Sequence, residues 1–396
     1  MFQRPHFQSI QQRTQQEARQ FIQVIYGPRQ VGKTTLVQQL LQQIPFPSHY
    51  ASADAITAGQ GVWISQQWEQ ARLAMQREGS KDGLLVIDEA QKIENWSEYV
   101  KREWDADTQA GLGLRVIVLG SSRLLLQKGL SESLAGRFEA TYLGHWSFAE
   151  MREAFGFDAA QYVWFGGYPG AAALTEDEER WKNYVSAALV EASISKDILM
   201  LTQVNKPALM KRLFELGCQF SGQILSFSKI LGQLQDAGNT TTLAHYLDLL
   251  HQAGLLSGLS KFSPNTLRQR ASSPKFQVHN TALLSAQQPL TRAQVQTNPT
   301  EWGRWVESAV GAHLLNQALT HDLELYYWRD RNQEVDFVLG HRNQYIGLEV
   351  KSRASKAQTN GMQAFHDRFQ PHKTLLIGPG GLPWEEFLAM EVREVF

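Results

Sequence analysis

Several features are scarce in this sequence, and each scarcity removes a class of protein. The 396 residues include a single cysteine, Cys218, so the chain can form neither an internal disulfide nor a cysteine-based metal site. The formal net charge is −1, so the molecule as a whole lacks the positive charge typical of nucleic-acid-binding proteins. Any DNA-binding surface would therefore have to be a local basic patch.

Long apolar segments are also missing. No apolar run approaches the roughly 20 residues that a membrane-spanning helix requires. The polar, glutamine-rich N-terminus lacks the apolar core of a signal peptide. We therefore expect a cytoplasmic protein without membrane association. Hydrophobic residues make up 43% of the chain, which supports packed cores, and the length predicts two or three domains.

The clearest motif is a glycine-rich loop between an apolar run and an amphipathic segment. It reads GPRQVGKTT and fits the pattern G-x-x-x-x-G-K-[ST], in which backbone N–H groups and the following helix N-terminus surround phosphates. We predict that ATP contacts its nine residues: Gly27, Pro28, Arg29, Gln30, Val31, Gly32, Lys33, Thr34 and Thr35. Lys33 is predicted to bridge the β- and γ-phosphates, and the Thr34 hydroxyl to be a Mg²⁺ ligand.

A second motif, LLVIDEAQ, ends an apolar run of the kind that forms a buried parallel strand. Asp88 at the end of this strand is predicted to hold the Mg²⁺ shell. Glu89 is predicted to act as general base on the attacking water. Two solvated acids after a strand would be the simpler interpretation, but the upstream phosphate loop argues against it.

A third apolar strand, RVIVLG, ends before Ser121. We predict that Ser121 senses the γ-phosphate, with Ser122 as the neighbouring candidate and ordinary turn chemistry as the alternative. Arg137 and Arg123 are candidates for stabilising transition-state charge. For either arginine, a plain surface salt bridge is the alternative.

The combination of GPRQVGKTT, LLVIDEAQ, LGSSR with SLAGR, and FGGYPG resembles a prokaryotic ATPase family of the AAA+ superfamily. Members of that family usually carry a C-terminal restriction-endonuclease-like domain. The resemblance spans nearly the whole chain and implies an α/β fold with an ASCE-type parallel sheet followed by a helical lid. The chain departs from the family pattern at Asn280 and Ala282, where the family usually has Asp and Gly.

Residues 221–262 read as helix, turn, helix and strand, which resembles a winged helix. The second helix has no Lys or Arg to face phosphates. Basic residues lie nearby instead: Lys261, Arg268, Arg270 and Lys275. DNA docking through the wing is therefore one interpretation, and a packing or relay module is the favoured one.

The C-terminal part carries a second set of polar residues. A predicted helix contains Glu307, one predicted strand contains Asp336, and the next contains Glu349 and Lys351 on the same face. This is the constellation of the PD-(D/E)xK nuclease fold. Asp336 and Glu349 are predicted to bind Mg²⁺ or Mn²⁺, Lys351 to position or activate water, and Glu307 to add a ligand. The alternative is a docking module that kept the polar cluster.

The sequence thus predicts an ATPase domain over 1–160, a helical lid over 161–220, a winged-helix-like segment over 221–283, a linker over 284–300 and a nuclease-like domain over 301–396. The predicted function is AAA+-type ATP hydrolysis coupled to DNA binding or processing. The alternative is an ATP-dependent switch that acts on a protein partner, with a non-catalytic C-terminal domain. A small-molecule kinase fits less well, because it requires neither the Glu after Asp88 nor a fused C-terminal domain.

Overall fold

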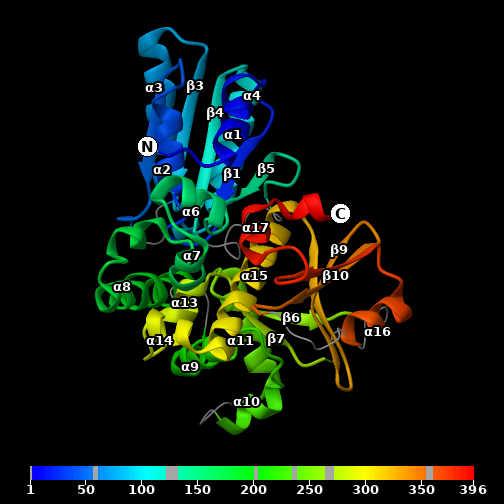
Figure 1. Cartoon of the computed structure of the whole chain (residues 1–396). Helices are drawn as coiled ribbons and strands as arrows, with labels where there is room; N and C mark the ends of the chain where they lie inside the picture. Colours follow the sequence, from blue (N-terminus) through cyan, green and yellow to red (C-terminus); the bar gives the residue numbers. More distant parts are fainter. Residues whose placement is uncertain are drawn as a thin grey trace. The chain divides into compact units, whose positions relative to one another are not determined.

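Two compact units make up the chain, Met1–Leu143 and Gly144–Phe396, and each contains its own β-sheet (Figure 1). The computed structural model describes residues 2–56, 61–121, 133–199, 204–233, 239–263, 272–353 and 360–396. The first unit ends at Leu143, earlier than the predicted boundary at 160. Helix α6 (Phe148–Phe155), which the sequence assigns to the ATPase domain, packs instead with helices of the second unit.

The first unit is built on a five-stranded parallel sheet in the order β2-β3-β4-β1-β5. Its strands are β1 (Ile22–Tyr26), β2 (Ser48–Ser52), β3 (Asp82–Asp88), β4 (Gly113–Gly120) and β5 (Phe138–Tyr142). Strand β4 lies between β1 and β3. Because all strands run in the same direction, the phosphate loop after β1, the acids after β3 and the serine after β4 emerge at one edge of the sheet.

Helices cover both faces of this sheet, which explains why its strands are apolar on both sides. Helices α1 (His6–Gln15) and α2 (Lys33–Leu41) pack on one face, and α3 (Val62–Glu78) and α4 (Trp96–Ala110) on the other. Successive side chains alternate between the two cores: Val86 contacts the α1–α2 side and Ile87 the α3–α4 side. A short 3₁₀ turn, η1 (Ala90–Lys92), follows β3.

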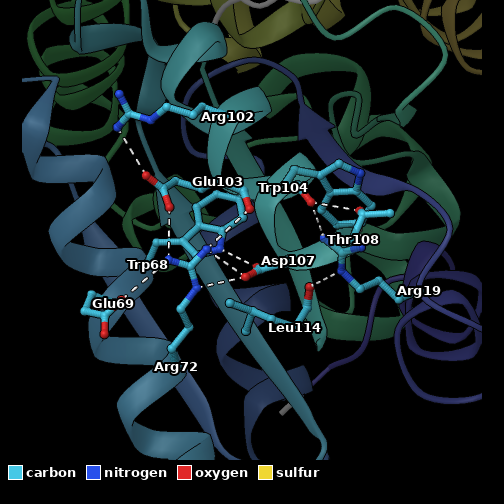
Figure 2. Close-up of polar contacts among 10 residues, drawn as sticks. All are labelled: Arg19, Trp68, Glu69, Arg72, Arg102, Glu103, Trp104, Asp107, Thr108 and Leu114. Carbon is cyan, nitrogen blue, oxygen red and sulfur yellow. Dashed lines mark hydrogen bonds and ion pairs between the residues drawn. The ribbon is translucent and has the colours of Figure 1, made fainter. Parts of the chain in front are cut away.

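A buried polar network joins α3 to α4 (Figure 2). The side chain of Asp107 is 1% exposed, and it accepts hydrogen bonds from Trp68 Nε1 at 2.6 Å and from Arg72 Nε at 2.8 Å. Arg72 also pairs with Glu103 at 3.0 Å. Arg19 also contacts α4: its guanidinium lies 3.5 Å from the centre of the Trp104 ring, in a cation–π arrangement.

The second unit begins with the helices predicted over 150–220. They are α6, α7 (Ala159–Phe165), α8 (Glu178–Tyr184) and α9 (Pro207–Gln219), with a 3₁₀ turn η2 (Pro169–Leu174) and two π-helical stretches η3 (Val185–Glu191) and η4 (Ser193–Leu199). The FGGYPG stretch packs closely against Asn280 in this unit. Asn280 Oδ1 accepts a hydrogen bond from Gly167 N at 3.1 Å, and a Cβ at Gly166 would lie 1.9 Å from the same oxygen.

The second unit also contains a six-stranded mixed sheet in the order β11-β10-β9-β8-β6-β7. Its strands are β6 (Leu256–Lys261), β7 (Lys275–Val278), β8 (Glu324–Asp330), β9 (Gln333–His341), β10 (Gln344–Val350) and β11 (Lys373–Ile377). Helices α10 (Phe227–Gln233) and α11 (Thr240–Gln252) precede the antiparallel pair β6–β7. Since β6 also pairs with β8, the predicted winged-helix-like and nuclease-like segments share one sheet.

The linker predicted over 284–300 is wrong, because the region is mostly helical. Helices α13 (Thr281–Ala286), α14 (Arg292–Thr297) and α15 (Pro299–His321) follow one another closely. The polar residues that suggested a linker are helix caps: Thr291 caps α14 with a capping box, and Asn298 caps α15. The remaining elements are α16 (Asn360–Phe369), which packs on β9 and β10, α17 (Trp384–Ala389) and η5 (Val392–Val395).

Candidate functional site

The phosphate loop connects β1 to α2 through two glycines with distinct tasks. A Cβ at Gly27 would lie 2.0 Å from the carbonyl oxygen of Leu143, so only glycine allows this close approach of two backbones. Gly32 caps α2 with a φ of 89°, in the left-handed region that favours glycine. Both glycines of the G-x-x-x-x-G-K-[ST] motif are therefore required by the backbone of the loop. Thr34 and Thr35 are exposed at the start of α2.

Lys33 is folded onto its own loop. Its side-chain ammonium donates to the carbonyl oxygens of Gly27 at 2.8 Å and Pro28 at 2.7 Å. Arg4, which is 5% exposed, stabilises the loop by donating a hydrogen bond to Val31 O at 3.1 Å. The N-terminus of α2, which carries a partial positive charge, and the Lys33 ammonium thus both lie at this loop. Together they favour the binding of an anion.

The loop contacts the end of β3 directly. Thr34 Oγ1 donates to Asp88 Oδ2 at 3.0 Å, and the hydroxyl of Tyr50 on β2 donates to the same oxygen at 2.7 Å. Burial and this hydrogen bond raise the pKa of Tyr50 above its ordinary value, so the phenol remains a donor. The Thr34 hydroxyl and the Asp88 carboxylate supply oxygen atoms only, which suits Mg²⁺. These two residues therefore fit the metal that was predicted here.

Glu89 follows Asp88 in a left-handed backbone conformation, with a φ of 55°. Its Oε2 accepts from Gln91 Nε2 at 2.5 Å and from Ser121 Oγ at 3.2 Å. Ser121 is the residue after β4, so the register of the parallel strands brings these two sequence-predicted residues together. Gln91 and Ser121 therefore help to fix the position of the Glu89 carboxylate at the end of β3.

Arg137 does not join this group, and the structure supports the alternative interpretation of a surface salt bridge. It precedes β5 at the opposite edge of the sheet, where Arg137 O accepts from Ile22 N at the start of β1. Its guanidinium pairs with Asp105 on α4 at 2.8 Å. This position corrects the prediction that Arg137 stabilises transition-state charge on a phosphate bound by residues 27–35 of the same chain. Ser122 and Arg123 lie outside the described residues.

The C-terminal candidates are brought together on neighbouring strands of the second unit. The antiparallel register pairs Leu348 with Phe337, which places Glu349 of β10 opposite Asp336 of β9. Asp336 Oδ2 accepts from Val350 N at 2.8 Å, and Lys351 Nζ donates to Glu349 Oε1 at 2.6 Å. The predicted clustering of Asp336, Glu349 and Lys351 is thus present in the structure.

Lys275 on β7, which the sequence placed among the basic residues near the wing, is instead buried inside this cluster. Its side chain is fully buried, and its ammonium lies 2.8 Å from Glu307 Oε1 on α15 and 3.7 Å from Asp336 Oδ1. It also donates to Asp336 O at 3.1 Å. Burial alone would lower the pKa of Lys275, but Glu307 and Asp336 outweigh it and raise the pKa above the ordinary lysine value. The ammonium is therefore charged.

The carboxyl groups of the cluster are difficult to ionise together. Burial raises the pKa of Glu349 to about 7, and Asp336 adds to the effect while Lys351 opposes it. Burial also raises the pKa of Glu307 to about 7, against the attraction of Lys275. Among the described residues, no three His, Cys, Asp or Glu side chains are grouped so as to hold a metal ion. The predicted metal set of Glu307, Asp336 and Glu349 is therefore corrected: Lys275 already binds two of its members.

The exposed face of α11 has no cationic side chain, in agreement with the sequence. Its exposed residues are Thr240, Thr241, Ala244, His245 and Asp248. Lys261 at the end of β6 is half-buried. Arg268 and Arg270, the other basic residues expected near the wing, lie outside the described residues. The described part of this segment therefore offers no row of phosphate contacts.

Three functional-site contacts were not anticipated from the sequence. Gln91 belongs to the LLVIDEAQ motif, and its position two residues after Glu89 was the available signal. Tyr50 gave no such signal, and Lys275 was expected near the wing, because each reaches its site through strand pairing that the linear sequence does not specify. No helix in the described residues is both long and apolar enough to cross a membrane.

Comparisons with known proteins agree with this geometry. Residues 19–152 match a family described as AAA domain. Residues 156–294 and 302–386 match two families described as Domain of unknown function (DUF8612) and Domain of unknown function (DUF4143). An uncharacterized protein of Mycobacterium tuberculosis is 27% identical over 364 residues, which cover 90% of this chain and 76% of that protein. An uncharacterized protein of Haemophilus influenzae is 22% identical over 388 residues, covering 93% and 92%.

Among solved structures, the Walker-type ATPase of Pyrococcus abyssi aligns with a TM-score of 0.48 and 13% identity over 72% of this chain and 96% of that one. The Thermotoga maritima RuvB Holliday junction branch migration motor aligns with a TM-score of 0.34 and 16% identity over 65% and 89%. Within the first unit, the region that matches the AAA-domain family thus contains the five-stranded parallel sheet and the phosphate loop.

Proposed function

We propose that the first unit binds Mg²⁺-ATP at residues 27–35 and hydrolyses it. The observation that carries this proposal is the direct contact between Thr34 on the phosphate loop and Asp88 on β3, with Glu89 next to them. In this proposal Lys33 leaves the loop carbonyls to bind the β- and γ-phosphates. Thr34 and Asp88 hold Mg²⁺, which neutralises charge on the phosphate oxygens. The strand order, with β4 between β1 and β3, supports the ASCE-type sheet that the sequence suggested.

Glu89 is the proposed general base. It would accept a proton from the water that attacks the γ-phosphate. Ser121 and Gln91 hold its carboxylate, so any displacement of Ser121 by a bound γ-phosphate would also change the position of Glu89. This shared contact is what supports Ser121 as the γ-phosphate sensor, because it joins sensing and catalysis in one hydrogen-bonded group.

We propose further that the nucleotide state controls binding of a protein partner through the second unit. Two observations support a protein rather than DNA: the exposed face of α11 has no Lys or Arg, and the C-terminal carboxylates already have a buried lysine as counter-ion. A winged helix used for packing agrees with its strands being part of the larger sheet. The protein is proposed to act in the cytoplasm.

DNA binding or processing is the second candidate. The observation that favours it is the assembly of Asp336, Glu349 and Lys351 on adjacent strands, as expected for a PD-(D/E)xK-like domain. Fold alone does not establish this activity. Lys351 is 35% exposed and is the member of the set that remains accessible to a substrate phosphate.

The first experiment is steady-state ATP turnover by the purified chain, with Mg²⁺ or with a chelator, and with or without DNA at low salt. Mg²⁺-dependent turnover that DNA does not change supports the protein-directed switch. Absence of turnover under all conditions contradicts the ATPase proposal.

DNA processing is tested separately with single- and double-stranded substrates, comparing the wild type with Lys351→Ala. Cleavage that disappears in the variant would favour the second candidate. Cleavage of equal rate in both proteins would point to a contaminating nuclease and argue against this site.

A further inference from the structure

The position of Lys275 in the second unit suggests a role for this residue. It belongs to β7, at one end of the six-stranded sheet order, whereas Asp336 and Glu349 belong to β9 and β10. Its fully buried ammonium reaches Glu307 on α15 and the backbone and side chain of Asp336. One side chain thus connects three elements that are far apart in the sequence.

Burying an ammonium group is costly unless acids surround it. Here four carboxyl groups, those of Glu307, Glu334, Asp336 and Glu349, act on two lysines, Lys275 and Lys351. Arg329 pairs with Glu334 at 3.8 Å, so the four acids face three cations and still outnumber them. Glu349 Oε2 is buried and has no hydrogen-bond partner among the residues that the structure describes.

The ammonium of Lys275 has the contacts that a metal ion would need. It touches carboxylate and carbonyl oxygens, the ligands that Mg²⁺ and Mn²⁺ prefer. A divalent ion placed among Glu307, Asp336 and Glu349 would stand close to this fixed positive charge, and the repulsion would weaken its binding. The lysine and the metal thus compete for the same oxygens.

We propose that Lys275 is a built-in cation that replaces a divalent metal in the C-terminal cluster. In the native protein the cluster holds the sheet and α15 together without a metal. Removal of the lysine charge converts the same carboxylates into a binding site for Mn²⁺ or Mg²⁺. The proposal concerns the carboxylates of the DNA-processing candidate but does not depend on cleavage, because its readout is metal binding.

Lys351 provides a matched control. It also pairs with a carboxylate, Glu349, but its side chain is 35% exposed while that of Lys275 is fully buried. Solvent therefore screens its charge, and its flexible stem can move the ammonium away from an incoming metal. Replacing Lys351 removes the same formal charge without opening the interior position.

The test is a titration of the full chain with Mn²⁺, followed by electron paramagnetic resonance of the free ion, without nucleotide. Wild type, Lys275→Met, Lys351→Met and Asp336→Asn are compared, together with the double variant Lys275→Met/Asp336→Asn. We expect Lys275→Met to bind Mn²⁺ at least about tenfold more tightly than wild type. The double variant should lose this gain, and Lys351→Met should resemble wild type.

Because Lys275→Met leaves buried carboxyl groups without their counter-ion, its thermal unfolding is measured in parallel. Rescue of its folding by Mn²⁺, but not by the same concentration of K⁺, would support the proposal. Wild-type protein provides a test that needs no substitution at Lys275. If it already binds Mn²⁺ and Asp336→Asn abolishes that binding, the lysine does not replace the metal and the proposal is overturned. That result would strengthen the DNA-processing candidate and leave the ATPase proposal unchanged.

Discussion

The hydroxyl of Thr34 and the carboxylate of Asp88 are in hydrogen-bond contact at 3.0 Å, although they belong to different strand–loop connections of the first unit. The parallel sheet causes this contact, because it directs the ends of β1 and β3 to the same edge. Tyr50 donates to the same carboxylate oxygen from β2. Three connections therefore fix the position of one carboxylate, so the proposed Mg²⁺ ligands are pre-oriented by the sheet.

Replacing Lys33 with alanine should abolish ATP turnover, with a loss of at least about 100-fold, because the β/γ-phosphate contact stabilises charge in the transition state. Steady-state phosphate release measures the effect. Lys81→Ala, at an exposed position of the same unit, is the control and should keep wild-type activity. Turnover near the wild-type rate in Lys33→Ala would show that the loop does not bind the phosphates as proposed.

Replacing Glu89 with glutamine should separate binding from hydrolysis. The side chain keeps its size and an oxygen that can accept from Gln91 and Ser121, but it cannot accept the proton of the attacking water. We expect ATP affinity within about twofold of wild type and hydrolysis reduced by about 100-fold or more. Equilibrium binding of a fluorescent ATP analogue and phosphate release test the two parts. Undiminished hydrolysis would assign the base to another residue.

Replacing Asp107 with alanine should destabilise the first unit by about 3 kcal/mol, because it leaves Trp68 Nε1 and the Arg72 guanidinium without their buried acceptor. Urea unfolding followed by circular dichroism measures the change. Glu69→Ala is the control, since Glu69 also pairs with Arg72 but is 57% exposed. That variant should lie within about 0.5 kcal/mol of wild type. Equal effects would mean that burial does not determine the strength of this network.

The contribution of His313 on α15 to the stability of the second unit should decrease in acid. Burial lowers the pKa of His313 to about 4, against a hydrogen bond to the backbone of Met390, whereas the unfolded side chain titrates near about 6.5. The unfolded state therefore binds more protons between these values. The contribution of His313 is complete above about pH 6.5 and is lost toward pH 4, at up to about 1.4 kcal/mol per pH unit.

Unfolding free energies measured from pH 7 to pH 4 test this expectation. His313→Asn should show a weaker pH dependence in that range. His366→Asn, at an exposed position on α16, should follow the wild-type curve. If His313→Asn and wild type lose stability in parallel, acid sensitivity arises from other groups.

The sequence predicted the first unit well because its signals are local. An apolar run ending in Asp88 and Glu89 describes both a buried strand and the chemistry at its end. The second unit was harder to predict, because its sheet combines strands from two segments that looked like separate domains. The capping residues Thr291 and Asn298 are the same residue types that occur in loops, so α14 and the adjoining ends of α13 and α15 resembled a linker.

The site residues were likewise predictable where the signal was local, and less so where it depended on strand pairing. Ser121 and Glu89 were predicted from their positions at strand ends, and the structure joins them. Tyr50 was missed and Lys275 was assigned to the wing, because their positions depend on which strands are neighbours. Arg137 was predicted to lie near the phosphates, but it comes just before strand β5 and not after a strand. A residue before a parallel strand lies at the edge opposite to one that follows it.

The pairing of β6 with β8 also determines how this protein can be divided. A fragment beginning at residue 301 would contain every predicted C-terminal site residue, yet it would lack β6, β7 and therefore Lys275. The edge of β8 would be unpaired, with backbone groups free to pair with another chain. Two carboxylates, those of Glu307 and Asp336, would also lose their buried partner. Such a fragment would aggregate, or bind metal ions that the whole chain excludes, and its properties would misrepresent those of the intact protein.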